Sequence, residues 1–210
     1  MTGPAGPPGP ARLILATRNP GKLAELRRIL AAAGVSAAVT DLDDVPGMPE
    51  VAETGRSFTD NALLKARTVA AFTGLPAVAD DSGLCVDALN GMPGVLSARW
   101  SGSHGDDEAN LQLLLAQLAD VPAGERGAQF VCVAALVLPS GGEHLAEGTV
   151  RGLLTRSPRG SNGFGYDPIF VPDGFELTTA QMSAEEKDKI SHRGKALRAL
   201  APVIARELGG

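Results

Sequence analysis

The apolar residues of this chain recur with two spacings, and the spacing distinguishes expected strands from expected helices. The unbroken apolar run Leu13-Ile14-Leu15-Ala16 is typical of a buried strand. After it, Leu23, Leu26 and Leu30 recur every three or four residues, which predicts a helix, and Gly34 stands where such a helix would end. The pattern therefore predicts a strand, a loop and a helix at the start of the folded part.

The same signals continue along the rest of the chain. They predict a helix from Ser57 or Thr59 to about Phe72, a strand ending at Asp80, a helix from Asp106 through Leu118, a β-hairpin over residues 130–150, a capping box at Ser183 and a last helix starting at Ser191. Strands alternate with helices and no internal repeat is present, which predicts a mixed α/β fold.

Composition and charge narrow the picture. The chain has 210 residues, 44% of them hydrophobic, so we expect one two-lobed domain over residues 12–210 and a disordered Pro/Gly-rich tail over residues 1–11. A net charge of -5 provides no basic surface, and we expect no nucleic-acid partner. No apolar run approaches the roughly 20 residues that span a bilayer, and no signal-peptide pattern is present, so we expect a cytoplasmic protein with no membrane partner.

Two adjacent carboxylates, Asp80 and Asp81, follow an apolar run and precede Ser82-Gly83. If the strand ends in a Ser-Gly turn, the acids lie at the carboxyl end of a sheet, where α/β folds bind ligands. Like charges this close need a cation or a proton to compensate them, which indicates a divalent metal or a general base. Ordinary turn chemistry, without a functional role, is the alternative interpretation.

The loop after the first strand has the chemistry of a phosphate site. Asn19 is placed to cap the following helix and Pro20 to occupy its first position. Free backbone N–H groups and the helix dipole favour an anion at such a terminus, and Lys22 lies one turn further on. A normal capped helix with a solvated lysine is the alternative.

Two later segments also have binding chemistry. The segment from Ser183 to Arg193 places several cations and His192 around a helix start, which suits a polyphosphate or the edge of a base. In Gly163-Phe164-Gly165-Tyr166-Asp167-Pro168, the glycines permit a close approach of the backbone and the two rings offer a stacking face for a planar base. The alternatives are a solvated charged face for the first segment and a turn with core aromatics for the second.

Five motifs, taken together and in this order, resemble those of the inosine triphosphate pyrophosphatase family. They are Thr17-Arg18-Asn19-Pro20-Gly21-Lys22, Ala79-Asp80-Asp81-Ser82-Gly83-Leu84, Pro93-Gly94-Val95-Leu96-Ser97-Ala98-Arg99, Gly163-Phe164-Gly165-Tyr166-Asp167-Pro168 and Ser191-His192-Arg193-Gly194-Lys195-Ala196-Leu197. The resemblance runs from about Arg12 to the last helix. It implies an elongated mixed sheet flanked by helices, with two lobes around a central nucleotide-binding cleft, and a homodimer.

The resemblance also implies an activity: hydrolysis of the noncanonical purine nucleoside triphosphates ITP, dITP and XTP to the monophosphate and pyrophosphate, with Mg²⁺. Asp81 matches the catalytic proton acceptor, which is also a metal-associated acid, and Glu53 matches an acidic position linked to Mg²⁺. The positions that match substrate-binding residues are Thr17, Arg18, Asn19, Pro20, Gly21, Lys22, Ser82, Phe164, Gly165, Tyr166, Asp167, Lys187, His192 and Arg193. Arg18 is a small departure, because several relatives carry glycine there.

The chemistry of a triphosphate agrees with these assignments. Attack at the α-phosphorus needs cations to hold the departing pyrophosphate and a carboxylate to activate a water molecule, for which we expect Asp81, with Asp80 and Glu53 as metal partners. The alternatives are a pyrophosphatase of the septum-inhibition type, a nucleotide sensor without catalysis and a partner-binding protein. Ser191-His192-Arg193 favours the purine family, and the acids together with Lys22 favour an enzyme.

Overall fold

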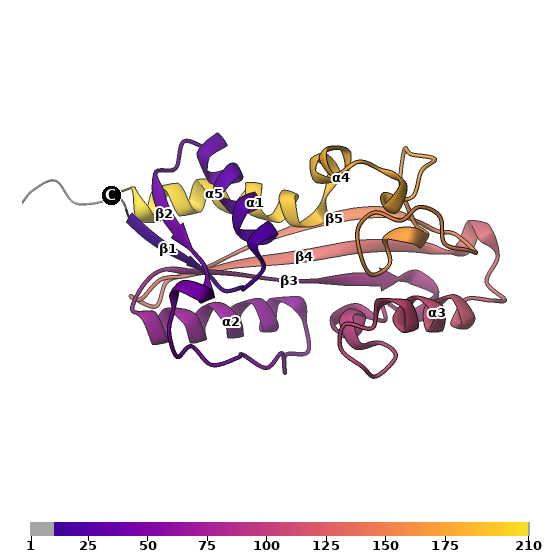
Figure 1. The fold of residues 1–210 in the computed structure, drawn as a ribbon, viewed down its shortest axis with the longest axis horizontal. Coiled ribbons are helices and arrows are strands. Elements are labelled where there is room, and N and C mark those ends of the chain that lie inside the picture. The colour runs from indigo at the N-terminus through magenta and orange to yellow at the C-terminus, as the bar shows by residue number, and fades with distance from the viewer. Residues whose placement is uncertain (1–10, 210) are drawn as a thin grey trace, which may run out of the picture.

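The computed structural model describes residues 11–209 and has an elongated mixed α/β fold (Figure 1). One six-stranded sheet has the order β2-β1-β3-β4-β5-β6. Its strands are β1 (Ala11–Leu15), β2 (Ala37–Thr40), β3 (Ala77–Val86), β4 (Gly127–Val137), β5 (Glu143–Leu154) and β6 (Phe170–Pro172). β1 pairs in parallel with β2 and β3, and the remaining pairs are antiparallel. The sheet and its flanking helices confirm the predicted fold class.

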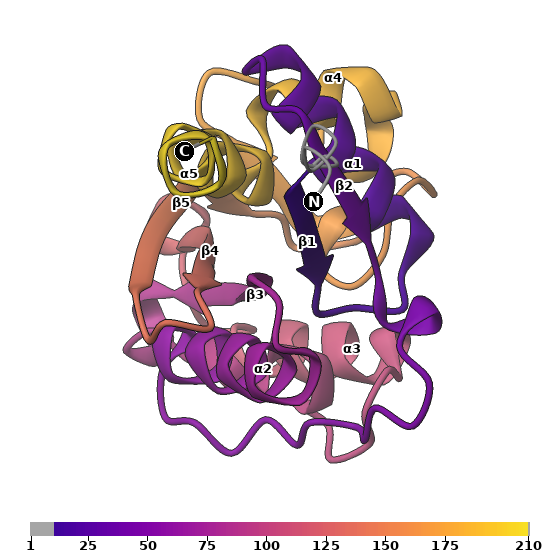
Figure 2. The same cartoon turned by 90° about the vertical axis from the view of Figure 1, so that its left-hand side faces the viewer.

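Within residues 11–209, five α-helices cover the two faces of this sheet. They are α1 (Pro20–Ala32), α2 (Phe58–Thr73), α3 (Asp107–Gln117), α4 (Ala184–Ile190) and α5 (His192–Leu208). α1, α4 and α5 lie on one side, called here the α5 face, and α2 and α3 lie on the other, called the α2 face (Figure 2). Among residues 11–209, no helix is both long and apolar enough to cross a membrane.

Alternating side chains of the strands form separate cores on the two faces. Val78 of β3 packs with α1 and α5, for example against Leu26 and Leu200. Its neighbours Ala77 and Ala79 pack with α2 instead. A third cluster forms farther along the long strands, where α3 meets the ends of β3 and β5. The alternation means that adjacent residues of β3 face different helices, which decides where Asp80 and Asp81 point.

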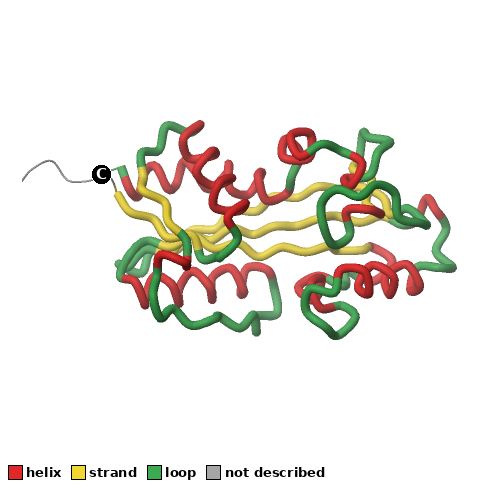
Figure 3. Tube along the Cα trace, viewed as in Figure 1, coloured by secondary structure: helices red, strands yellow, loops and turns green. Residues whose placement is uncertain are grey.

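β3 does not end at Asp80, so that sequence prediction is wrong. The strand continues to Val86 and pairs with β4 along its whole length, with Asp80 opposite Ala134 and Asp81 opposite Val133. The Asp-Asp-Ser-Gly segment is therefore part of an extended strand and not a turn, because pairing with β4 holds the backbone straight. Figure 3 shows these two long strands side by side through the centre of the molecule.

β1 accompanies β3 over only a short distance. Its pairing with β3 covers Ala77 and Val78. Farther along β3, within residues 11–209, the same edge has one isolated β-bridge, between Cys85 and Pro93. The two acids thus lie where β1 has ended, with helix-borne side chains on both faces. The expected tail falls mostly on residues outside the described ones, and its last residue, Ala11, is the first residue of β1.

Most of the locally predicted elements are present. Asn19, Ser57, Asp106, Ser183 and Ser191 all accept hydrogen bonds as helix caps, as their positions predicted. The β4-β5 hairpin is also confirmed. The short strands β2 and β6 were not expected, because runs of three or four residues give almost no periodic signal.

Candidate active site

Asp81 lies on the α2 face, where α2 supplies a polar partner. Its Oδ2 accepts a hydrogen bond from Nδ2 of Asn61 at 2.8 Å, and its Oδ1 accepts one from the backbone N–H of Ser82 at 3.0 Å. The residue is only 8% exposed. Asn61 is fully buried in the second turn of α2, so the carboxylate is held by a rigid element.

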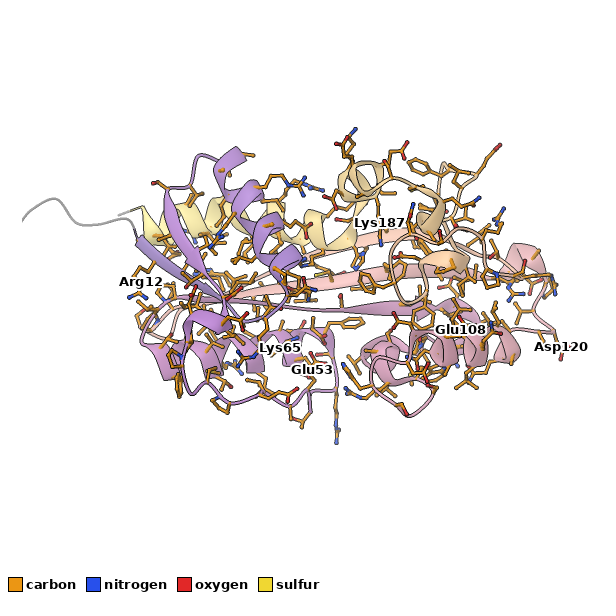
Figure 4. All side chains as sticks on the ribbon, in the orientation of Figure 1. Arg12, Glu53, Lys65, Glu108, Asp120 and Lys187 are labelled. Carbon is orange, nitrogen blue, oxygen red and sulfur yellow. The ribbon has the colours of Figure 1, made fainter. Side chains whose placement is uncertain are left out.

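Lys65, one turn after Asn61, lies between two carboxylates. Its Nζ donates to Oε1 of Glu53 at 2.7 Å and lies 3.7 Å from Oδ1 of Asp81. Figure 4 shows Glu53 and Lys65 together on this side of the long strands. Burial raises the pKa of Asp81, the charge of Lys65 and the Asn61 hydrogen bond oppose the rise, and Glu53 adds to it. The α2 face thus holds a buried carboxylate whose charge is incompletely compensated.

Asp80 faces the α5 face, where both of its carboxylate oxygens accept hydrogen bonds. Its Oδ2 accepts from Nζ of Lys22 at 2.7 Å, and Oδ1 accepts from Nε of Arg193 at 3.3 Å. Arg193 also donates to Glu25 at 2.7 Å and to the carbonyl oxygen of Lys22 at 3.1 Å. Burial alone would raise the pKa of Asp80, but the charges of Lys22 and Arg193 outweigh it and hold that pKa well below its usual range.

The loop between β1 and α1 is ordered by its own side chains. Oδ1 of Asn19 accepts from the backbone N–H groups of Gly21 at 2.9 Å and Lys22 at 3.2 Å, so the cap itself occupies these two donors. Oγ1 of Thr17 accepts from the N–H of Asn19 at 3.2 Å. The loop therefore presents two cations, Arg18 and Lys22, of which Arg18 pairs with Asp43 and Lys22 with Asp80.

A cavity of about 520 Å³ connects this loop with the α2 face. It is lined by Ala16, Arg18, Leu42, Pro49, Glu50, Val51, Lys65 and Val69. The Arg18 guanidinium donates to Asp43 at 3.1 Å and to the carbonyl oxygen of Met48 at 3.4 Å, and so ties down the segment that forms the cavity's outer wall. Arg18, Lys65 and one acid, Glu50, are the charged residues of the lining, and Lys65 connects the cavity with Asp81.

The glycine-rich segment forms a second centre on the α5 face. The buried carboxylate of Asp167 accepts from the N–H of Phe164 at 2.9 Å and from Oγ1 of Thr179 at 2.8 Å, and it forms an ion pair with Lys187. Nζ of Lys187 lies 5.1 Å from the centre of the Phe164 ring. The ring itself is 78% exposed, so a planar ligand can reach it. Figure 4 shows Lys187 beside α4, across the strands from Glu53.

His192 begins α5 close to this centre. Its imidazole stacks on Phe130 of β4, with ring centres 5.0 Å apart and an angle of 13° between the rings. Burial lowers the pKa of His192 to about 4, and the charge of Lys187 acts in the same direction, so the imidazole is neutral at physiological pH. In the sheet, Ser82 of β3 pairs with Cys132 of β4, which in turn pairs with Gly148 of β5. The start of α5 packs over Gly148.

Comparison with known proteins identifies the family of this chain. The profile of the Ham1 family matches residues 13–203. The chain belongs to the Ham1 family. A Streptomyces avermitilis protein named dITP/XTP pyrophosphatase is 61% identical over 198 residues, which cover 94% of this chain and 99% of that protein. The resemblance predicted from the five motifs is thereby confirmed.

Solved structures agree with this membership. The crystal structure of a nucleoside-triphosphatase / dITP/XTP pyrophosphatase from Mycobacterium abscessus is 60% identical, with a TM-score of 0.79, and the match covers 92% of this chain and 99% of that one. A HAM1 protein from Coxiella burnetii is 39% identical with a TM-score of 0.86, covering 93% and 99%. The family fold thus extends over nearly the whole chain.

In this Ham1-family protein, the structure brings Lys22 and Arg193 to Asp80 on one face of β3. On the other face, Lys65 joins Glu53 to Asp81, whereas Phe164, Asp167 and Lys187 form the separate centre described above. Glu53 and Asp81 meet on the α2 face, whereas Asp80 is turned away from them. Tyr166 is buried, and its hydroxyl donates to the carbonyl oxygen of Ser97 at 2.9 Å, so it belongs to the core and offers no stacking face. Among residues 11–209, no group of three or more His, Cys, Asp or Glu side chains is arranged to hold a metal ion.

Sequence reasoning missed Asn61 and Lys65, which contact Asp81 directly. The available signal was a polar pair spaced i, i+4 on the buried face of α2, beside Ala62 and Ala66. Phe130 was also missed, because an aromatic residue in an apolar strand is normally read as core. Each of these residues becomes informative only once its partner across the fold is known.

Proposed function

We propose that this chain hydrolyses the noncanonical purine nucleoside triphosphates ITP, dITP and XTP to the nucleoside monophosphate and pyrophosphate, and so removes them from the nucleotide pool. One observation carries the proposal: a buried carboxylate, Asp81, is fixed by Asn61 beside Glu53 and Lys65. The 61% identity to a protein named dITP/XTP pyrophosphatase supports the choice of substrate class.

Glu53 and Asp81 fit a magnesium ion. Both direct carboxylate oxygens toward one positive charge, the ammonium of Lys65, so the region already accommodates a cation. Mg²⁺ prefers oxygen ligands and is commonly held by one or two carboxylates together with substrate phosphates. When bound, it would withdraw charge from the phosphates and stabilise the departing pyrophosphate. Asp80 is not part of this proposed set, because Lys22 and Arg193 occupy its two oxygens.

Asp81 is the proposed general base. A water molecule beside its carboxylate attacks the α-phosphorus, Asp81 accepts the proton, and the bond from the α-phosphorus to the bridging oxygen breaks so that the electron pair leaves with pyrophosphate. Burial raises the pKa of Asp81 and so makes it a stronger base than an ordinary carboxylate. The Asn61 hydrogen bond fixes one oxygen and leaves the carboxylate in one orientation.

The phosphates are proposed to lie between the two lysines nearest the acids. Lys22 approaches from α1 and Lys65 from α2, and the cavity of about 520 Å³ extends from Lys65 to Arg18. Cations on both sides match the several negative charges of a triphosphate. Arg18 is proposed to support phosphate binding indirectly. Its guanidinium donates to Leu42, Asp43 and Met48 and so holds the outer wall of the cavity in place.

The base is proposed to lie on the α5 face against Phe164. The exposed ring provides a stacking surface, and Lys187 and the neutral His192 are nearby donors for the six-oxo group of hypoxanthine or xanthine. Adenine carries an amino group at that position and would leave such donors unpaired, at about 1–3 kcal/mol each. Arg193 is proposed to act indirectly, because Glu25 and Asp80 fix its guanidinium.

The test is pyrophosphate release from ITP, XTP, dITP, GTP and ATP, each with magnesium and with excess chelator. We expect rapid, metal-dependent release from the first three and little from GTP and ATP. Thermal stabilisation by ITP without pyrophosphate release would identify a sensor instead. Release of orthophosphate alone would require a different phosphohydrolase. We further propose a cytoplasmic homodimer, for which the solution mass by sedimentation is the first check.

A further inference from the structure

Asn61 is a fully buried amide that contacts two parts of the proposed active site. Its Nδ2 donates to Oδ2 of Asp81 at 2.8 Å, and its Oδ1 accepts from the backbone N–H of Gly55 at 2.7 Å. Gly55 lies two residues after Glu53. A single side chain therefore joins the general base on β3 to the loop that carries the second acid.

The two hydrogen bonds leave the amide only one orientation. A backbone N–H is a donor, so the amide oxygen must face Gly55, and the NH₂ group must then face Asp81. An ionised carboxylate accepts hydrogen bonds only, and Asn61 therefore favours the charged form and fixes its plane. With the Ser82 N–H on the other oxygen, both oxygens of Asp81 are held.

The loop approaches the helix too closely for any residue but glycine. A Cβ atom at Gly55 would lie 2.6 Å from Oδ1 of Asn61 and 2.9 Å from its backbone nitrogen. Glu53 in this loop is also held by Lys65 from the same helix, at 2.7 Å. One face of α2 thus positions both acids.

We propose that Asn61 is a positioning residue of the reaction: it sets the carboxylate of Asp81 and the Glu53 loop in one arrangement without contacting the substrate. The proposal rests on the proposed role of Asp81 as the base. Loss of residues that orient catalytic ligands commonly reduces activity by about 10–100-fold. The nucleotide contacts proposed above, Lys22, Lys65 and Phe164, are other side chains, so the effect should fall on kcat and not on KM.

Asn110 provides a matched control within the same chain. It is also a buried helical asparagine, 1% exposed, and its Oδ1 accepts from the backbone N–H of Ser101 at 2.7 Å. Its Nδ2, however, has no hydrogen-bond partner within the described residues. Replacing Asn110 therefore removes a similar buried amide and a similar hydrogen bond to the backbone, but it removes no hydrogen bond to a catalytic acid.

The experiment compares Asn61→Leu and Asn61→Ala with Asn110→Leu and Asn110→Ala, measuring kcat and KM for ITP and the Tm of each variant. Alanine has the highest helix propensity, so at least the second variant of each pair should fold. We expect a larger fall in Tm at position 61, because replacing Asn61 also removes the hydrogen bond to the Asp81 carboxylate, whereas Nδ2 of Asn110 has no partner to lose within the described residues. The Asn61 variants should lose about 10–100-fold in kcat with KM within about threefold. The Asn110 variants should keep most of their kcat.

Equal losses of kcat at the two positions, or an Asn61 variant with more than half of the wild-type kcat, would overturn the positioning role. Asp81→Asn in the same series distinguishes this failure from failure of the proposed function. If Asp81→Asn is inactive while the Asn61 variants remain active, only the Asn61 proposal is wrong. If Asp81→Asn turns over normally, the role of Asp81 is wrong, and the Asn61 proposal falls with it.

Discussion

Asp80 and Asp81 are adjacent and identical, but on opposite faces of β3 their pKa values move in opposite directions. On the α5 face, Asp80 is paired with two cations, and its pKa lies well below the usual range. On the α2 face, Asp81 shares one lysine with Glu53, and its pKa is raised. A shift of one residue along the strand thus exchanges a structural carboxylate for one suited to proton transfer.

The charged neighbours on the helices, and not the residue type, determine in which direction the pKa of each aspartate moves. Pairs of carboxylates whose surroundings push their pKa values apart commonly divide stabilising and catalytic work between them. The division of roles that we propose follows from strand geometry, because alternate residues face α1 and α5 or face α2. The comparison makes opposite predictions for the loss of each acid.

The largest effect is expected from Asp81→Asn. Removing a general base should reduce kcat for ITP by about 10²–10⁴-fold. The variant removes a charge that burial disfavours, but its NH₂ group must face one of two donors, Asn61 Nδ2 or the Ser82 N–H, so its loss of stability at pH 7 should be smaller than that of Asp80→Asn. Pyrophosphate release and urea unfolding measure the two properties. A variant that is both inactive and strongly destabilised would contradict the contrast between the faces.

Asp80→Asn should show the reverse pattern. It leaves Lys22 and Arg193 without a buried counter-charge, and removing one partner of a buried ion pair commonly costs about 3 kcal/mol of unfolding free energy. The loss should be present above pH 3.8, the ordinary pKa of the group. It should shrink as the pH falls below that value, because the unfolded chain then binds a proton at Asp80 that the folded protein, with its lowered pKa, does not bind. Unfolding curves between pH 2 and 7 measure this, and a constant difference would be the contrary result.

Local signals in the sequence predicted the helix boundaries well. Asn19, Ser57 and Asp106 are caps because their side chains bond backbone groups two or three residues away, and such contacts need no knowledge of the rest of the fold. The course of β3 past Asp80 could not be predicted in this way. It depends on pairing with β4, which lies about fifty residues later in the chain.

The site was predictable only in part, for the same reason. Motif resemblance matched Asp81 and Glu53, which the structure brings to the same lysine, whereas Asp80 was expected as a metal partner from the chemistry of a triphosphate and is turned to the other face. The partners that separate the two acids, Lys65 on one face and Arg193 on the other, come from distant helices. Which acid is compensated is therefore a property of packing, and it becomes visible only in three dimensions.

His192 is a second titrating group on the α5 face, and its pKa is also lowered. Between pH 6.5 and about 4, the unfolded chain binds a proton at His192 that the folded protein does not. Unfolding free energy should therefore fall as the pH drops through this window, by at most about 3.5 kcal/mol, since each pH unit is worth about 1.4 kcal/mol. His192→Gln should flatten the urea-unfolding stability curve there. An unchanged slope would mean that the folded imidazole is protonated in this range.

The smallest effects test whether the α5 face binds the base through Phe164 and not through Tyr166. Phe164→Ala should raise KM for ITP roughly tenfold, since stacking of a base on an aromatic ring is worth about 1–3 kcal/mol. Its Tm should hardly change, because the ring is 78% exposed. Tyr166→Phe removes the hydrogen bond to Ser97 and should cost about 1 kcal/mol of stability with KM unchanged. If Tyr166→Phe raised KM and Phe164→Ala did not, the base would have to lie toward Ser97, at the opposite edge of the glycine-rich segment.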